Sequence, residues 1–224
     1  MSRLPLLLVL VAVVTPQAPA PLRVKASPAV APCVAAAALE YERATGRKLA
    51  VEAGPLGSPA SAEGADVVVA ADQELNRIIE SGTSHPQLDV DVARIPWVLA
   101  GPPGSEALDP RALGRSTGLV RVLDGVVARE AWRSLTQQGQ APARVVRVRD
   151  ARAPLRLEPG EAAVVPLSLA GKGPVASLAV PPLAVRALGV RASARAADAR
   201  DFLDFLTGEK GHAAFGACGR PETR

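Results

Sequence analysis

The stretches VPPLAV (residues 180–185) and ADARDFLDFLTGEKGHAAF (residues 197–215) decide the fold of this chain. The first is a strand-like apolar run, and the second has apolar residues at the spacing of two consecutive amphipathic helices. The start of the chain has the same components, since residues 22–26 predict a short strand and residues 32–45 predict a helix that Gly46 ends. Both ends of the chain therefore carry pieces of an α/β unit.

Between the two ends, segments with strand and helix patterns alternate. The run Leu49–Ala53 predicts a second strand, and Ala65–Ala70 is apolar apart from Asp66, as expected of a strand buried in a parallel sheet. A helix is expected to begin at Asp72 and to end at Gly82. Strand, helix, strand and helix with short loops indicate a doubly wound α/β arrangement.

A second α/β segment starts near residue 95. A helix is expected at residues 128–138, and strands are expected at residues 95–100, 120–123, 145–148 and 162–165. The chain is then expected to return to the first segment, so that two crossing strands join two lobes as a clamshell with a cleft. The predicted division of the chain is a signal peptide at 1–20, a first lobe at 21–94 and 178–224, and a second lobe at 95–177.

The N-terminus has the three parts of a secretory signal. Arg3 is the charged residue, residues 4–14 form an apolar run interrupted by Pro5, and Ala18-Pro19-Ala20 fits a small-x-small cleavage site. Pro21 after this cut is unfavourable for a signal peptidase, so either the cut shifts or the segment stays as a membrane anchor. Both alternatives predict a periplasmic location for the rest of the chain.

The composition argues against two classes of function. The net charge of +4 is spread along the chain and aromatic residues make up 3% of it, so the sequence lacks the basic and aromatic pattern of a nucleic-acid-binding protein. The motifs of nucleophilic, phosphate-loop and metal-dependent enzymes are absent as well. The two histidines, His85 and His212, are not at ligand spacing from Cys33 or Cys218. We therefore expect neither an enzyme nor a metal or cofactor site.

Serine residues follow several of the predicted strands. Ligands of open α/β sheets bind beyond the carboxyl ends of the strands, and this region contains Ser27, Ser58, the loop around Gly125 and the loop Pro166–Ser168. Serine hydroxyls and the free N–H groups at helix N-termini donate hydrogen bonds without a countercharge. They are suited to a tetrahedral oxyanion. The alternative is that these serines are only helix caps and turn formers.

These positions match a known pattern. Ala26-Ser27 after the first strand, Ser58 in the next loop, ADVVVAAD at residues 65–72 and the final stretch at residues 199–219 resemble the periplasmic molybdate-binding proteins, which are extracellular solute-binding proteins of ABC transporters. The resemblance implies a type II periplasmic-binding fold of two doubly wound α/β lobes. It also implies a monomer, an ABC transporter permease as partner, and molybdate or tungstate as the ligand. The ligand-binding positions that it implies are Ser27, Ser58, Gly125 and Pro166.

The chain departs from this family at three places. The helix after the Ser58 loop is reduced to a few residues, and Pro59 lacks an amide hydrogen that could face an anion. The loop after Asp124-Gly125 is short, and Pro166 stands where the family commonly has a tyrosine that faces the ligand. These departures leave a second hypothesis open. It is a degenerate relative that keeps the fold but binds another small ligand or a protein partner.

Two cysteines, Cys33 and Cys218, lie near opposite ends of the chain. An oxidising compartment would permit a bridge between them, and two small buried thiols are the alternative. In the family that the chain resembles, the last helix returns to the first lobe, where Cys33 begins the first helix. The resemblance therefore predicts a disulfide between Cys33 and Cys218.

Overall fold

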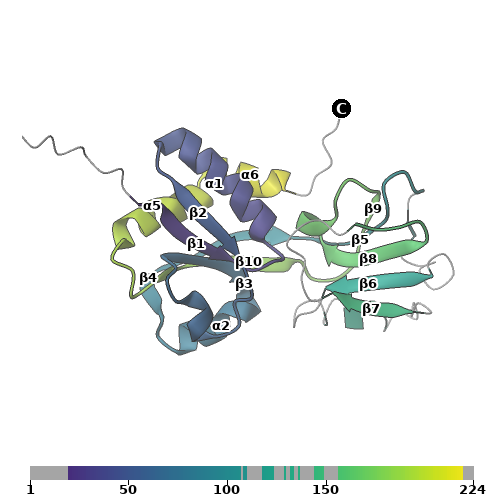
Figure 1. The fold of residues 1–224 in the computed structure, drawn as a ribbon, viewed down its shortest axis with the longest axis horizontal. Coiled ribbons are helices and arrows are strands. Elements are labelled where there is room, and N and C mark those ends of the chain that lie inside the picture. The colour runs from purple at the N-terminus through teal and green to yellow at the C-terminus, as the bar shows by residue number, and fades with distance from the viewer. Residues whose placement is uncertain are drawn as a thin grey trace, which may run out of the picture.

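The protein has two lobes, each built around a five-stranded sheet, in a computed structural model (Figure 1). The structure describes residues 20–106, 108–109, 118–123, 129, 132–133, 136, 144–148 and 156–218. Residues 1–19 of the predicted signal peptide therefore lie outside the described residues. The same holds for Gly125 and for most of the helix predicted at residues 128–138.

The sheet of the first lobe has the strand order β2-β1-β3-β10-β4. These strands are β1 (Leu22–Ala26), β2 (Leu49–Ala53), β3 (Val67–Ala71), β4 (Ser84–Ile95) and β10 (Leu183–Val190). All five residues of the central strand β3 are buried, which confirms the prediction of a buried central strand at this run. β1 pairs in parallel with β2 and β3, whereas β10 is antiparallel to both β3 and β4, so the sheet is mixed.

The sheet of the second lobe has the order β7-β6-β8-β5-β9. These strands are β5 (Trp97–Ala100), β6 (Leu119–Leu123), β7 (Val145–Val148), β8 (Glu161–Pro166) and β9 (Val175–Ser177). The predicted strand at residues 162–165 is confirmed as the central strand, β8. Next to it, the Arg121 guanidinium donates two hydrogen bonds of 2.8 and 3.1 Å to Glu161 and holds the pKa of this carboxyl below its usual value.

Two segments cross between the lobes. β4 passes into β5 through Pro96, and the chain returns from β9 to β10 through residues 178–182. β4 and β10 pair along most of their length, from Leu183 opposite Ile95 to Val190 opposite Ser84. The hinge of the clamshell, Pro96 and residues 178–182, therefore continues directly from a pair of antiparallel strands of the first lobe (Figure 1).

The observed start of β10 differs from the start that the sequence predicts for this strand. The sequence predicts a strand at residues 180–185, but the strand begins at Leu183 and continues to Val190. Pro181 and Pro182 have no amide hydrogen and cannot donate to a strand ladder, so pairing starts after them. The strands β4 and β9 were not predicted.

Helices cover both faces of the first sheet (Figure 1). They are α1 (Ala31–Thr45), α2 (Asp72–Glu80), α5 (Ala196–Thr207) and α6 (Glu209–Ala217), with the 3-10 helix η1 (Pro59–Ala62). The 3-10 helix η3 (Leu167–Leu169) follows β8 in the second lobe. On one face, the ring of Tyr41 in α1 packs in T-shaped contact with Phe202 and Phe205 in α5 at centroid distances of 5.3 Å. On the other face, Leu75 and Ile78 of α2 pack in a separate core with residues of β3 and β10. The predicted pair of final helices is confirmed.

The shortened connection after Ser58 leaves part of this second face open. Only the four residues of η1 stand where a covering helix would lie, and a shallow cavity of about 350 Å³ there is lined by residues of β1, β2 and the loop after η1. Lys25 extends over this surface and donates from Nζ to the carbonyl oxygen of Glu63 at 2.7 Å. A polar side chain thus replaces the missing apolar cover.

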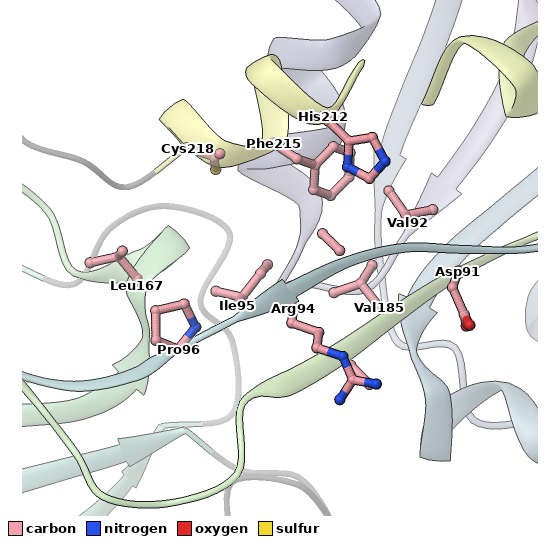
Figure 2. A pocket seen from close by; sticks show the side chains of 13 residues that line it. Asp91, Val92, Arg94, Ile95, Pro96, Leu167, Val185, His212, Phe215 and Cys218 are labelled. Atoms are coloured by element: carbon pink, nitrogen blue, oxygen red, sulfur yellow. The ribbon is translucent and has the colours of Figure 1, made fainter. Parts of the chain in front are cut away.

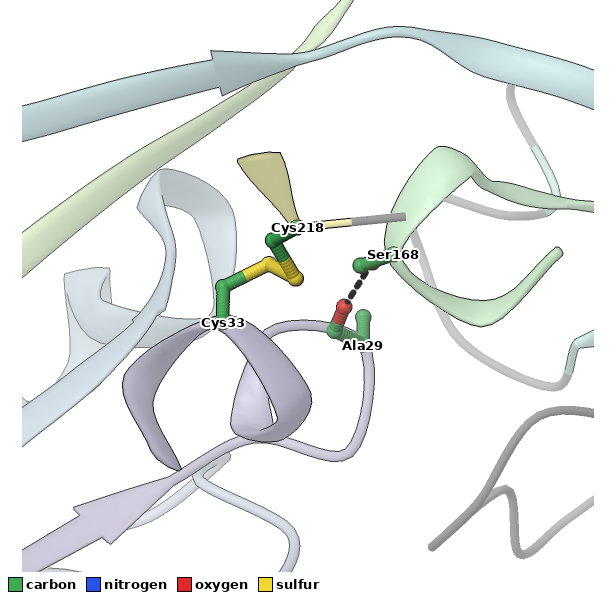
Figure 3. The surroundings of a disulfide bond; sticks show 4 residues. All are labelled: Ala29, Cys33, Ser168 and Cys218. Carbon is green, nitrogen blue, oxygen red and sulfur yellow. Dashed lines mark hydrogen bonds between the residues drawn. A yellow bond between two sulfur atoms is a disulfide. The ribbon is translucent and has the colours of Figure 1, made fainter. Parts of the chain in front are cut away.

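A disulfide ties α6 to the first turn of α1 (Figure 3). Cys33 and Cys218 are 185 positions apart in the sequence, and their Cα atoms are 5.1 Å apart. The predicted bridge is confirmed. It joins the beginning of the first lobe to the segment that completes this lobe.

Removing the disulfide is expected to destabilise the fold. A cross-link that closes so long a loop lowers the entropy of the unfolded chain and contributes about 4–5 kcal/mol in the chain-entropy model. The double variant Cys33→Ala/Cys218→Ala should therefore unfold about 10 °C below the wild type in differential scanning calorimetry. Wild-type protein in a thiol reductant is the matched control, and its unfolding midpoint should decrease by a similar number of degrees. Unchanged midpoints in both samples would contradict the bridge.

Candidate ligand-binding site

Ser27 is the first residue after β1 and is held firmly by its backbone. Its N–H donates to the carbonyl oxygen of Val69 on β3 at 3.0 Å, and its own carbonyl accepts from the N–H groups of Val30 and Ala31 at 3.0 and 2.9 Å. These bonds connect the end of β1 to the start of α1. The position predicted from the sequence is therefore a rigid turn at the carboxyl ends of the parallel strands.

The side chain of Ser27 is fully buried, and its hydroxyl makes no short hydrogen bond among the described residues, although it interacts with the carboxylate of Glu74. Buried hydroxyls are normally paired, and an unpaired one costs about 1–3 kcal/mol. A polar atom of a ligand that accepts from this hydroxyl would remove the cost. Ser27 is thus a candidate donor for a ligand, and the Glu74 carboxylate is the acceptor that competes for it.

Glu74 lies next to Ser27 and was missed by the sequence analysis. It is the third residue of α2, and its carboxylate turns back to accept the N–H of Ala71 at 3.2 Å. Burial raises the pKa of Glu74, and the nearby Ser27 hydroxyl and the Ala71 amide offset this only in part. The sequence contains only half of a capping box, because the N-cap is Ala71 and has no side-chain acceptor. A Glu at this position indicates the start of a helix and does not point to a ligand.

Ser58 is placed differently from Ser27. Its loop starts beside the site, because the N–H of Gly54 donates to the carbonyl of Ala26 at 3.0 Å. Ser58 itself is exposed, and its carbonyl accepts the hydroxyl of Ser61 at 2.5 Å in the turn that begins η1. The structure therefore brings the loop to the site while the Ser58 side chain lies at the surface.

The second lobe reaches the site through the end of β8. Pro166 is buried as the last residue of β8, opposite Trp97, and the N–H of Leu167 after it donates to the carbonyl of Pro96. Ser168 is also buried, and its hydroxyl donates to the carbonyl of Ala29 at 2.5 Å (Figure 3). This hydrogen bond joins the two lobes directly beside the Ser27 turn.

A cavity lies beside the hinge (Figure 2). This cavity of about 500 Å³ is lined by the end of β4 with Ile95 and Pro96, by His212 and Phe215 of α6, and by Leu167. Neither Ser27 nor Glu74 lines it. Its walls are apolar apart from Asp91, Arg94 and His212. Because the resemblance to known binding proteins points to the Ser27 turn, where a buried hydroxyl makes no short hydrogen bond, we place the candidate site at the strand ends.

No metal centre is evident in the part of the chain that the structure describes, since no three His, Cys, Asp or Glu side chains gather there at ligand distance. In the same part, no helix has the length and apolar character needed to span a bilayer. The polar groups that the structure places at the strand ends are the Ser27 hydroxyl and the Glu74 carboxyl group.

Residues 22–220 match the family model of bacterial extracellular solute-binding proteins. The chain belongs to this family. No curated protein sequence matches this solute-binding protein.

Solved structures share the fold of this solute-binding protein. The periplasmic molybdate-binding protein of Azotobacter vinelandii has a TM-score of 0.71 at 18% identity, with 88% of this chain and 97% of that chain covered. The substrate-binding domain of a putative molybdenum ABC transporter from Clostridium difficile has a TM-score of 0.64 at 15% identity, with 88% and 96% covered. The sulfate-binding protein SubI of Mycobacterium tuberculosis has a TM-score of 0.62 at 16% identity, with 90% and 87% covered. The fold is the type II periplasmic-binding architecture with two lobes.

The hydrogen bond between the lobes can be tested by Ser168→Ala. The variant leaves the carbonyl of Ala29 without its buried donor, which should cost about 1–3 kcal/mol of unfolding free energy in urea denaturation. Ser177→Ala, at an exposed position of β9 in the same lobe, is the matched control and should be close to neutral. Equal stabilities of the two variants would contradict a buried contact between the lobes.

The raised pKa of Glu74 predicts a pH dependence of stability. Between the ordinary pKa and the raised one, the folded protein binds more protons than the unfolded chain, so stability falls as the pH rises through this window. In Glu74→Gln this fall in stability should be absent, and the thermal midpoint at neutral pH should be higher than that of the wild type. The midpoints of both proteins are measured from about pH 4 to pH 8. Glu80→Gln, at the exposed end of α2, should keep the wild-type profile. A wild-type midpoint that does not fall in this window would contradict the assignment.

Proposed function

We propose that this solute-binding protein holds a small oxyanion between its lobes and delivers it to the permease of an ABC transporter. The observation that carries the proposal is the Ser27 hydroxyl, which is fully buried at the end of β1 and makes no short hydrogen bond among the described residues. An oxyanion oxygen accepts hydrogen bonds strongly and would satisfy this donor. The protein acts as a binding protein, not as an enzyme.

The family resemblance suggests molybdate or tungstate as the ligand. Two of the structural neighbours are described as a molybdate-binding protein and as part of a putative molybdenum transporter, and a third is described as a sulfate-binding protein. Their names support a small oxyanion as the ligand class for this chain. Ser58 and the backbone near Gly125 and Pro166 would complete the set of neutral groups around it.

The proposed setting is the periplasm. The family is one of extracellular proteins, and residues 1–20 have the pattern of a signal peptide. The protein is proposed to act there as a monomer that meets the permease after binding its ligand.

A second candidate is a relative that keeps the fold but binds another small ligand or a protein partner. It is favoured by the hydrogen bond from Ser168 to Ala29, which brings together the two loops between which an oxyanion would lie. The exposed position of Ser58 and the absence of an amide hydrogen at Pro59 point in the same direction.

Ligand binding should depend on the two serines. Molybdate, tungstate, sulfate and phosphate are screened by thermal shift, and the affinity of each ligand that raises the midpoint is measured by calorimetry. The double variant Ser27→Ala/Ser58→Ala should weaken binding by roughly a hundredfold, because two hydrogen bonds to an ion together contribute a few kcal/mol.

The single variants and Ser177→Ala serve as controls. Ser27→Ala is expected to account for most of the loss, and Ser177→Ala should bind as the wild type does. Unchanged affinity of the double variant would show that the site is assigned wrongly. A wild-type protein that binds none of the four anions would favour the second candidate.

A further inference from the structure

The two cysteines of the disulfide differ in exposure. Cys33 is 0% exposed in the first turn of α1 and belongs to the main hydrophobic core of the protein. Cys218, which follows the last residue of α6, is only partly buried. The bridge joins the ends of these two helices (Figure 3). A molecule that approaches the bridge from solvent therefore meets Cys218 and not Cys33.

The hinge cavity leads to Cys218. This cavity of about 500 Å³ is lined by Cys218 but not by Cys33, and Figure 2 shows Cys218 at its wall on the same helix as Phe215. A space of this size is in the range that admits small molecules. The imidazole of His212 also lines the cavity and is exposed, and a neutral imidazole accepts a proton. The cavity is thus an entry path to one side of the bridge.

The bridge also supports the contact between the lobes through the first turn of α1. In this turn, the N–H of Cys33 donates to the carbonyl of Val30, and the N–H of Val30 donates to the carbonyl of Ser27, both at 3.0 Å. The neighbouring carbonyl of Ala29 accepts the Ser168 hydroxyl of the second lobe (Figure 3). Cleavage of the bridge removes the covalent support that α6 gives to this turn.

We propose that Cys218 is a site of thiol–disulfide exchange with a small thiol and that the exchange loosens the turn that connects the lobes. The thiolate of the incoming molecule attacks the Cys218 sulfur from the cavity. The bond between the two cysteine sulfurs breaks, and a mixed disulfide forms between the small molecule and Cys218. The electron pair of the broken bond stays on the Cys33 sulfur, which then takes up a proton.

A second molecule of the same thiol completes the reduction. Its thiolate attacks the mixed disulfide, which releases Cys218 as a thiolate and forms the disulfide of the small molecule. Attack in the reverse direction, at the Cys33 sulfur, would need a path through the buried core of the first lobe. Access therefore decides which sulfur receives the incoming thiol.

The order of attack is tested with the two single-cysteine variants. Cys33→Ala leaves Cys218 as a free thiol, and Cys218→Ala leaves Cys33. Both lack the same bridge, so each controls for the loss of stability in the other, and circular dichroism establishes that both are folded. With 5,5′-dithiobis(2-nitrobenzoate), Cys33→Ala should react at least about tenfold faster than Cys218→Ala. Equal rates, or a faster reaction of Cys218→Ala, would overturn the proposal.

The route through the cavity is tested with the intact bridge. Wild-type protein is treated with reduced glutathione, quenched with N-ethylmaleimide and mapped by mass spectrometry, which should place glutathione on Cys218. Gly216 lines the cavity and has open space where a side chain would begin. Gly216→Phe should therefore slow formation of the mixed disulfide by about tenfold, because access to the attacked sulfur limits the rate.

Ala213→Phe is the matched control, because this exposed position lies on the same helix and does not line the cavity. It should react as the wild type does. Equal slowing in Gly216→Phe and Ala213→Phe would overturn the route through the cavity. Glutathione found on Cys33, or on neither cysteine, would overturn the exchange at Cys218.

The effect on the turn is read by amide hydrogen exchange. After treatment with glutathione, the amides of Val30, Ala31 and Cys33 should exchange at least about tenfold faster than in the bridged protein. The amides of Val164 and Val165, in the central strand of the second lobe, should keep their protection. Unchanged protection of the turn, or an equal loss in both places, would overturn the local effect. The oxyanion takes part in none of these measurements, so they are independent of the proposed function.

Discussion

The structure depends on the pairing of β10 with β3 and β4. β10 comes from the last quarter of the chain and fills the space between two strands that precede it by about a hundred residues. Without it, β3 would be an edge strand although all five of its residues are buried. The apolar burial of the first lobe is therefore complete only after the chain has left for the second lobe and returned.

The same return positions the candidate site. α5 and α6 follow β10 and pack against α1, and the disulfide fixes the end of α6 to the first turn of α1. This first turn is hydrogen-bonded to the carbonyl of Ser27. The orientation of one buried hydroxyl is thus supported by packing and covalent constraints that extend to the end of the described chain.

Elements with an unbroken apolar run or a clear helical spacing were predicted from the sequence. β3 and β8 contain continuous apolar runs, and α5 has a clear helical spacing. β4 was missed although Leu88-Asp89-Val90-Asp91-Val92 alternates apolar and acidic residues, which is the pattern of a strand with one buried face. In β10, Gly189 interrupts the apolar pattern because a side chain there would lie 2.6 Å from Leu88.

The residues of the candidate site also differ in how far the sequence could predict their positions. Ser27 was predictable because it directly follows a recognisable strand. Glu74 was not, because its capping pattern is local whereas its position next to Ser27 arises from the register of β1 and β3. The exposure of Ser58 follows from the reduction of the next helix to the four residues of η1. A sequence motif locates the loop but not the direction of its side chain.

The disulfide also has a consequence for the order in which the chain folds during synthesis. The strands of the second lobe come from one continuous stretch and can pair while the C-terminal end is still unmade. The sheet of the first lobe cannot be completed before residues 183–190 are available. Until then β3 has an unpaired apolar edge of the kind that promotes aggregation. Cys218 emerges after all of these strands, so native oxidation is a late event. A bridged Cys33 marks a molecule in which assembly is complete.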